Sequence, residues 1–325
     1  MIKFFRQSYA IQYVVIALLA IALWIPAFIS RKVVSGLDSP VTPLFNLIDG
    51  WLGGSVLARQ ICAFLLLMFN ALIFNIILVN NQVIGKVGTM GAFVFVLLMS
   101  LTRIQAEFYP FLLSLFFILL LISILYSTYM SQSVEFDLLK AGISIAFASM
   151  CYFPSILLIF WVMVSLPIAK KGNFRLELIP LAGLLFMYFF YFAGVYLFGD
   201  FLATIHGYRD YVLQLKISVE YFNLKNILLL LLLVFVAVVM LFGGRNLEKS
   251  LSVRVKISMS VLLLLLSVFM LFLGGNVLYN GLIFIALSVL ISYEFSYIGN
   301  TGWADLLLTL FLLLVFANLY YFKML

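Results

Sequence analysis

Long apolar segments without charges alternate with short polar connections along the whole chain. Several of these segments reach the roughly 20 residues that a helix needs to cross a bilayer. The pattern therefore predicts an all-α, polytopic transmembrane bundle of about 11 spans, with short interfacial helices, that forms one integral membrane domain over residues 1–325. The predicted spans are 10–29, 57–79, 88–102, 109–128, 139–153, 155–169, 178–198, 226–243, 257–273, 277–293 and 304–322.

The spans at 139–153 and 155–169 are both short, and they meet at Pro154. Proline can end a helix or only kink it, so this stretch is either two separate spans or one bent span. The choice matters because it decides on which side of the membrane everything downstream lies, including the C-terminus.

Composition supports a membrane protein, since 66% of the residues are hydrophobic and the mean hydropathy is +1.25. Soluble domains contain roughly 45–50% apolar residues. The first span follows Lys3 and Arg6 and ends at Arg31 and Lys32 without a small-residue cleavage site, so we expect it to be retained as a helix rather than removed as a signal peptide.

The formal net charge of +7 comes from short basic clusters between the spans, so we expect membrane lipids and not nucleic acid as partners. With a cytoplasmic N-terminus, eleven of the 19 Lys and Arg residues lie inside. Those eleven are Lys3, Arg6, Lys86, Lys140, Lys170, Lys171, Arg175, Arg245, Lys249, Arg254 and Lys256. Because positive charge favours the cytoplasmic side, the count predicts a multi-pass protein whose N-terminus is cytoplasmic.

Cys62 and Cys151 lie in apolar stretches without metal-ligand spacing, and we expect them to be small core residues. Motifs for nucleotides, metals or nucleophilic triads are missing. We therefore expect no cofactor and no metal.

Two outward loops, 30–56 and 199–225, hold most of the candidate chemistry. In the first, Thr42 and Pro43 predict the start of a short helix whose apolar residues recur at helical spacing and lie in the membrane interface. Asp38 and Asp49 would face water, where a carboxylate can deprotonate an acceptor hydroxyl as a catalytic base. Their simpler interpretation is a Ser-Pro turn for Asp38 and a solvated position for Asp49.

In the second loop, "IHGYRDY" brings together the only histidine, an arginine and an aspartate. His206 and Asp210 lie one turn apart if the segment is helical, which makes His206 a third candidate catalytic residue. Arg209 and Asp210 are candidate substrate-binding residues, and the alternative is a solvated linker. Residues 213–221 then alternate as a strand would, although a helix fits nearly as well, and a strand there would pair with a protein partner.

Arg59 and Arg103 stand at the outer ends of the second and third spans. Such charges usually anchor a helix end at the interface, but a pocket shared with Asp38 and Arg209 would bind a phosphate. Four asparagines inside the spans are predicted to hold helices together by hydrogen bonds. They are Asn70, Asn75, Asn280 and Asn318.

Stretches such as "SPVTPLFNLIDGWLGGSVLARQ" and "FDLLKAGISIAFASMCYFPSILLIFW", over roughly residues 1–200, resemble a multi-pass membrane family of Bacteroidota that has no established function. This resemblance implies an inner-membrane protein of a diderm envelope and no particular activity. The layout of an acid in the first outward loop followed by an interfacial helix resembles multi-pass glycosyltransferases that use polyprenyl-phosphate sugars. The pair of acids found there in many of those enzymes is absent.

Three hypotheses follow for function. The leading one is a glycosyltransferase-like enzyme that acts on polyprenyl-phosphate-linked glycan or lipid at the outer leaflet. The alternative is a non-enzymatic subunit or scaffold of an envelope assembly or secretion complex, which binds a protein partner through loop 199–225. A lipid flippase or exporter comes third.

Overall fold

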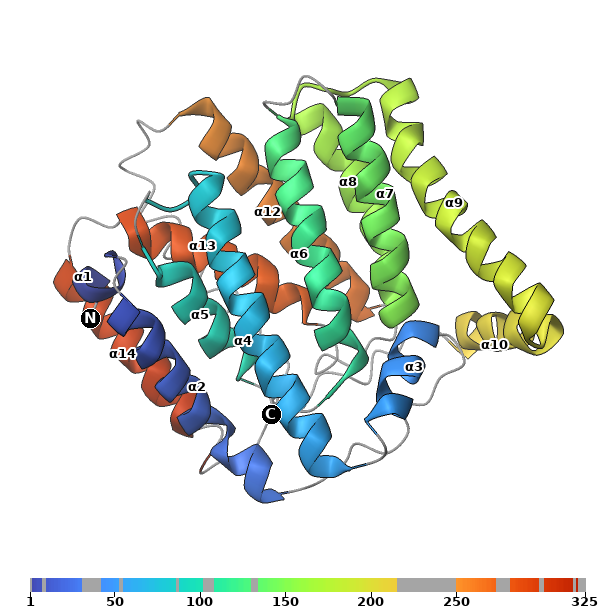
Figure 1. Ribbon diagram of the computed structural model, residues 1–325. Coiled ribbons are helices and arrows are strands. Elements are labelled where there is room, and N and C mark those ends of the chain that lie inside the picture. The colour runs from blue at the N-terminus through green and yellow to red at the C-terminus, as the bar shows by residue number, and fades with distance from the viewer. Residues whose placement is uncertain are drawn as a thin grey trace. The chain divides into compact units, whose positions relative to one another are not determined.

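A computed structural model describes residues 2–7, 10–30, 42–52, 55–85, 88–101, 108–129, 134–214, 250–272, 281–297, 301–317 and 320. Within these ranges the regular elements are all helices, and no strand is present (Figure 1). The chain groups into two compact units. Unit 1 comprises Met1–Val33, Val56–Phe108 and Ser218–Leu325, and unit 2 comprises Val34–Ser55 and Tyr109–Ile217.

Unit 1 contains seven of the described helices: α1 (Ile2–Phe5), α2 (Ala10–Ser30), α4 (Val56–Asn80), α5 (Met90–Met99), α12 (Leu251–Phe272), α13 (Leu282–Tyr297) and α14 (Thr301–Ala317). Unit 2 contains α3 (Pro43–Trp51), α6 (Pro110–Thr128), α7 (Val134–Cys151), the 3₁₀ helix η2 (Phe153–Leu157), α8 (Leu158–Ile168), α9 (Phe174–Phe198) and α10 (Phe201–Gln214).

Five described helices, namely α2, α4, α6, α9 and α12, are long and apolar enough to cross a membrane. The helical, multi-pass character of the chain thus agrees with the sequence. The count of about 11 spans stays a prediction. The predicted span 88–102 contains α5, which has only 10 residues and extends about 15 Å, half of a hydrocarbon core of about 30 Å. The predicted span 226–243 lies outside the described residues.

In unit 1, polar contacts fix α2 and α4 as an antiparallel pair. The Gln60 side-chain amide donates to the Ala27 carbonyl at 2.9 Å near one end, and the Asn75 amide donates to the Tyr13 hydroxyl at 3.3 Å near the other. Asn75 also donates to the Gly88 carbonyl at 3.0 Å, which confirms its predicted role between helices. Asn70 is fully buried, whereas Asn280 and Asn318 lie outside the described residues.

Two helices of unit 1 are buried on every side. All residues of α5 are buried, as are Leu282–Phe295 of α13, and these two helices pack against each other. A helix that is apolar all round fits either lipid or a protein core. The burial shows that α5 and α13 have protein around them.

In unit 2, contacts between side chains set the direction of each helix. Phe111 meets Tyr152, and further along α6 Phe117 stacks on Phe147, so α6 and α7 are antiparallel. Gly142 lies against Pro180, and further along both helices Ser149 hydrogen-bonds Tyr188, so α7 and α9 are parallel. Because α7 and α9 run in the same direction, the chain that connects the end of α7 to the start of α9 must return along the length of the unit.

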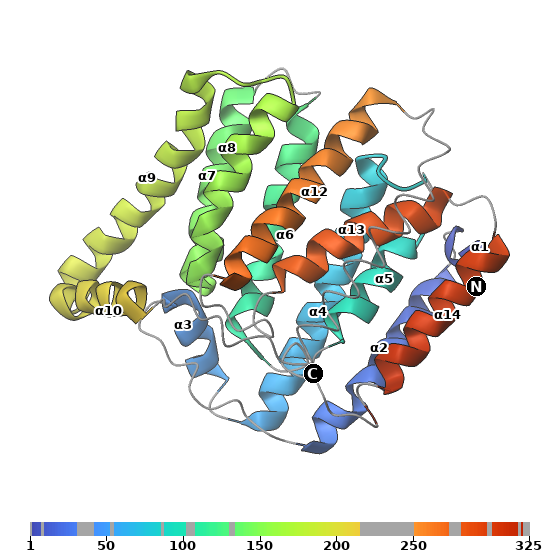
Figure 2. The ribbon, with the colours of Figure 1, turned by 180° about the vertical axis from the view of Figure 1, so that it is seen from behind.

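The return begins where α7 ends at Cys151. Tyr152 is extended (φ −141°, ψ 99°), and Pro154 lies in the first turn of η2, from which α8 leads back to the start of α9 (Figures 1 and 2). The predicted segments 139–153 and 155–169 are therefore two separate helical arms. The interpretation as one kinked helix is wrong, because an extended residue followed by proline ends the helix and turns the chain back.

Candidate functional site

The segment "IHGYRDY" is part of helix α10. Asp200 caps the start of this helix, since its Oδ1 accepts from the Ala203 backbone N–H at 3.1 Å. The helix continues through Gly207 to Gln214. The helical interpretation of this segment is confirmed up to Gln214, while most of the alternating stretch at 213–221 lies outside the described residues.

Tyrosines hold α10 on the rest of unit 2. The rings of Tyr208 and Tyr211 both meet Phe153 of η2 edge-on, at centroid distances of 5.4 Å, and Tyr208 meets Phe192 of α9 at 5.8 Å. Tyr208 and Tyr211 lie three residues apart, so they share one face of the helix. That face is the packed side of α10.

Burial raises the pKa of Tyr208 and of Tyr211 above the ordinary tyrosine value. For Tyr208, the neighbouring Tyr188 and Tyr191 raise the pKa further. Desolvation disfavours the phenolate, so both hydroxyls stay protonated at neutral pH. These tyrosines act as packing groups and are not candidate bases.

The three predicted site residues of α10 lie away from the packed face. His206 is exposed, and the side chains of Arg209 and Asp210 are 59% and 53% exposed. Arg209 donates from Nε to Asp210 Oδ1 at 3.1 Å, and its Nη2 lies at the same distance from that oxygen. The helix places His206 and Asp210 one turn apart, as predicted. Together they form a polar surface that is open to the surroundings.

Helix α3 confirms the short helix predicted after Thr42. Thr42 occupies the position before the helix and Pro43 its first turn, but the Thr42 side chain does not cap the helix. Phe45 is buried at 3% exposure, and α3 packs on α7. Asp49, on the same helix, is half-buried, and its role at the site stays a prediction. Trp51, at 86% exposure, is the most open apolar residue of this helix.

Both views place α3 and α10 at the same end of unit 2, where α7 and α9 end (Figures 1 and 2). We call this the α10 end. It brings together the helix that carries Asp49 and the helix that carries His206, Arg209 and Asp210. The described parts of the two predicted outward loops, 42–52 and 199–214, thus lie on one side of unit 2.

The opposite end of unit 2 holds the start of α7 and the loop before α9, with basic residues that were all predicted to be cytoplasmic. These are Lys140, Lys170, Lys171 and Arg175. The unit therefore separates the two predicted groups of loops by the length of its helices. Which end faces the cytoplasm stays a prediction.

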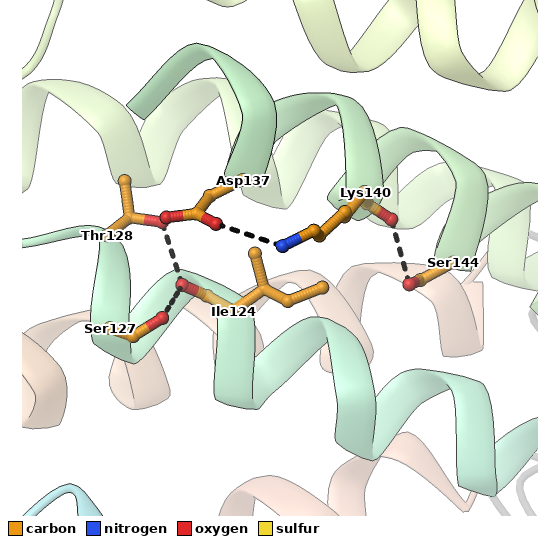
Figure 3. Close-up of polar contacts among 6 residues, drawn as sticks. All are labelled: Ile124, Ser127, Thr128, Asp137, Lys140 and Ser144. Carbon is orange, nitrogen blue, oxygen red and sulfur yellow. Dashed lines mark hydrogen bonds and ion pairs between the residues drawn. The ribbon is translucent and has the colours of Figure 1, made fainter. Parts of the chain in front are cut away.

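Figure 3 shows a group of local polar contacts at this opposite end. Ser127 and Thr128 donate to the Ile124 carbonyl at 2.8 and 2.7 Å, and Lys140 pairs with Asp137 at 3.6 Å. The Lys140 ammonium also lies 4.2 Å from the centre of the Phe136 ring. Contacts between residues three or four apart stabilise the helix ends, and this cluster is therefore structural.

The remaining predicted site residues are not among the described residues of unit 2. Arg59 belongs to unit 1, where it is half-buried near the start of α4. Asp38 and Arg103 lie outside the described residues. The pocket that was predicted to combine Asp38 with the three arginines stays a prediction.

Three features of the structure are not predicted by the sequence pattern. Gly142 of α7 and Gly183 of α9 allow a close helix contact that nothing in the local sequence marks. Lys256 was placed in a cytoplasmic loop, but it is only 5% exposed and donates to the Asn81 carbonyl at 2.7 Å. Glu294 is buried at 7% exposure, although the predicted span ended one residue before it. A charge directly after an apolar run was the available signal for Glu294.

No family model, curated protein or solved structure matches the chain. Within the described ranges, no three His, Cys, Asp or Glu side chains gather as metal ligands do.

Proposed function

We propose that the protein is an inner-membrane envelope protein that acts on a lipid-linked phosphate substrate as a glycosyltransferase-like enzyme, with polyprenyl phosphate as the carrier class. One observation carries this proposal. Helices α3 and α10, which hold Asp49 and the His206–Asp210 group, lie at the same end of unit 2. An acid, a histidine and an arginine at one end of a membrane bundle are the groups that this chemistry needs.

In the proposed reaction, Asp49 or His206 takes the proton from an acceptor hydroxyl. The acceptor oxygen forms a bond to the anomeric carbon of the sugar, and the bond from that carbon to the carrier's phosphate breaks. The phosphate leaves with the electron pair, and Arg209 neutralises its charge. Asp38 would be a further base, and Arg59 and Arg103 would be further phosphate ligands. With a cytoplasmic N-terminus, the α10 end would face the outer leaflet.

The first test is native mass spectrometry of the gently purified full chain, followed by identification of the lipids that it retains. We expect a polyprenyl phosphate on the wild type and its loss on Arg209→Ala. Arg175→Ala is the matched control, because Arg175 is also an exposed arginine but lies at the other end of α9. Equal retention by the two variants would contradict the role of Arg209.

A second measurement separates binding from chemistry. If Asp49 is the base, Asp49→Asn should keep the lipid but lose transfer of sugar to an acceptor by a factor of about 10²–10⁴, which is the usual contribution of a general base. The same result for His206→Gln, with Asp49→Asn active, would assign the base to His206. Full transfer activity in both variants would exclude both assignments.

A second candidate function is a non-enzymatic subunit of an envelope assembly. The openness of α10 favours it, since His206, Arg209 and Asp210 are exposed, and Leu202 and Leu213 are 67% and 69% exposed. Mixed apolar and charged exposed surfaces occur where proteins dock. A stoichiometric protein partner that is lost on Arg209→Ala, in a preparation without polyprenyl phosphate, would support this function.

A further inference from the structure

An apolar groove runs along one face of α4, in unit 1. Its lining residues are Ala58, Ile61, Cys62, Leu65, Leu66 and Phe69. They recur three and four residues apart, so they form one stripe of the helix. The groove has a volume of about 550 Å³, within the range of about 300–1,000 Å³ that is usual for small-molecule sites. From Ala58 to Phe69 it extends about 16 Å along the helix axis.

This face of α4 fits contact with lipid chains. Val56–Asn80 is apolar enough to cross a membrane, and Ile61, Leu65 and Phe69 are 44%, 61% and 51% exposed. Large apolar side chains that stay open on such a helix are expected to face hydrocarbon. The groove is long and only one helix face wide, and a single extended acyl chain fits that shape.

Arg59 stands next to the start of the groove. It is not one of the lining residues, but it lies in the first turn of α4, directly after Ala58 and three residues before Cys62, so it is a helical neighbour of the residues with which the groove begins. Arginine binds phosphate through several N–H donors. A phospholipid has this arrangement of parts, with an apolar chain that ends at an anionic phosphate in the interface.

We propose that the α4 groove binds one acyl chain of an anionic membrane phospholipid, whose phosphate is held by Arg59. A second copy of the protein is a poorer occupant. A two-fold contact through this face in parallel helices would bring two Arg59 side chains together, and like charges repel. The inference does not rest on the proposed function: the observation that carries that function concerns α3 and α10 of unit 2, and Arg59 enters it only as a further phosphate ligand.

The test uses the full chain in phosphatidylcholine vesicles that contain a small share of phosphatidylglycerol with a photoactivatable acyl chain. After illumination, mass spectrometry maps the cross-links. We expect them on the stretch from Ala58 to Phe69, about fivefold above those of a phosphatidylcholine probe with the same chain, the factor expected for one basic residue at an anionic headgroup. Arg59→Gln should remove that preference.

Groove-filling variants test the apolar part. Cys62→Phe and Ala58→Phe should each lower the cross-linking, whereas Ile76→Phe should not. Ile76 is 54% exposed on the same face of α4 but lies beyond the groove, so it is the matched control. The thermal midpoint of each variant shows that it is folded.

Three results would overturn the proposal. Equal labelling by the two probes would mean ordinary lipid contact without selection. Unchanged labelling in both groove-filling variants would place the chain elsewhere. Cross-links between two copies at α4, or displacement of the probe by polyprenyl phosphate alone, would identify a different occupant.

Discussion

The contact between α7 and α9 makes the sharpest prediction about stability. Gly142 lies so close to α9, and Gly183 so close to α7, that neither position has room for a side chain. A Cβ added at Gly142 would lie 2.0 Å from the Pro180 carbonyl oxygen, and one at Gly183 would lie 2.6 Å from the Leu139 carbonyl oxygen. Both obstacles are backbone atoms of a neighbouring helix, so no side-chain rotation relieves the overlap. Gly142→Ala should therefore push the two helices apart.

The size of the effect follows from the geometry. Ordinary contact begins at 3.4 Å, so an alanine at 142 needs about 1.4 Å of movement against the Pro180 carbonyl. Overpacking in a close-packed interior costs typically about 1–3 kcal/mol, and a backbone obstacle belongs at the upper end of that range. The close approach of small residues is also what drives helix association in lipid. We expect a loss of about 2–3 kcal/mol in the free energy of unfolding of unit 2.

Cys151 offers a built-in assay for this loss. It lies at the end of α7 at 1% exposure, so a thiol reagent reaches it only when the packing opens. In a Cys62→Ser background, the temperature at which Cys151 becomes labelled should fall for Gly142→Ala by roughly 4 °C or more. Gly194→Ala on α9 is the control, because nothing lies within 4 Å of its added Cβ, and it should leave the midpoint unchanged or raise it. Equal midpoints for Gly142→Ala and Gly194→Ala would refute the close contact.

Three further predictions concern single contacts. Lys256→Met removes the 2.7 Å hydrogen bond to the Asn81 carbonyl, directly after α4, and should lower the free energy of unfolding by roughly 1–3 kcal/mol in thermal denaturation; an unchanged midpoint would contradict it. Phe153→Ala removes the ring that both tyrosines of α10 contact, and should speed proteolysis within α10 about tenfold; wild-type rates would show that α10 is held otherwise. Because burial raises the pKa of Tyr208 in the folded state, the stability it contributes is full below the unfolded-state pKa of about 10 and is lost as the pH rises above it. Tyr208→Phe should therefore show a smaller fall in thermal midpoint between pH 9 and 11 than the wild type, and an equal fall would argue against the burial.

The sequence predicted the long helices well because their ends are marked by charge or turn residues. The apolar runs at 10–29 and 109–128 became α2 and α6 to within one residue. Composition could not distinguish a helix in lipid from a helix in a protein core, since both are apolar all round. That is why the run at 88–102 read as a span, although α5 is 10 residues long and buried.

Contacts between helices were beyond the sequence for a different reason. Gly142 and Gly183 are unremarkable within their own helices, and their importance arises only from the parallel course of α7 and α9. Likewise, Lys256 follows a basic cluster that is typical of a loop, but it is buried, and the Asn81 carbonyl provides its acceptor from another part of the chain. Local pattern shows which residues prefer lipid or water, and it does not show which backbone lies opposite.

The turn at Tyr152–Leu157 connects the fold to the proposed function. Were α7 and α8 one continuous helix, α9 would end at the other end of unit 2, and α10 would lie a helix length away from α3. The extended Tyr152 and Pro154 turn the chain back instead, and the parallel pairing of α7 with α9 then brings α10 to the end that carries Asp49. Phe153, in the same turn, is the residue on which Tyr208 and Tyr211 pack. A single short sequence, "YFP", thus both sets the side on which His206 and Arg209 lie and supplies the surface that holds their helix.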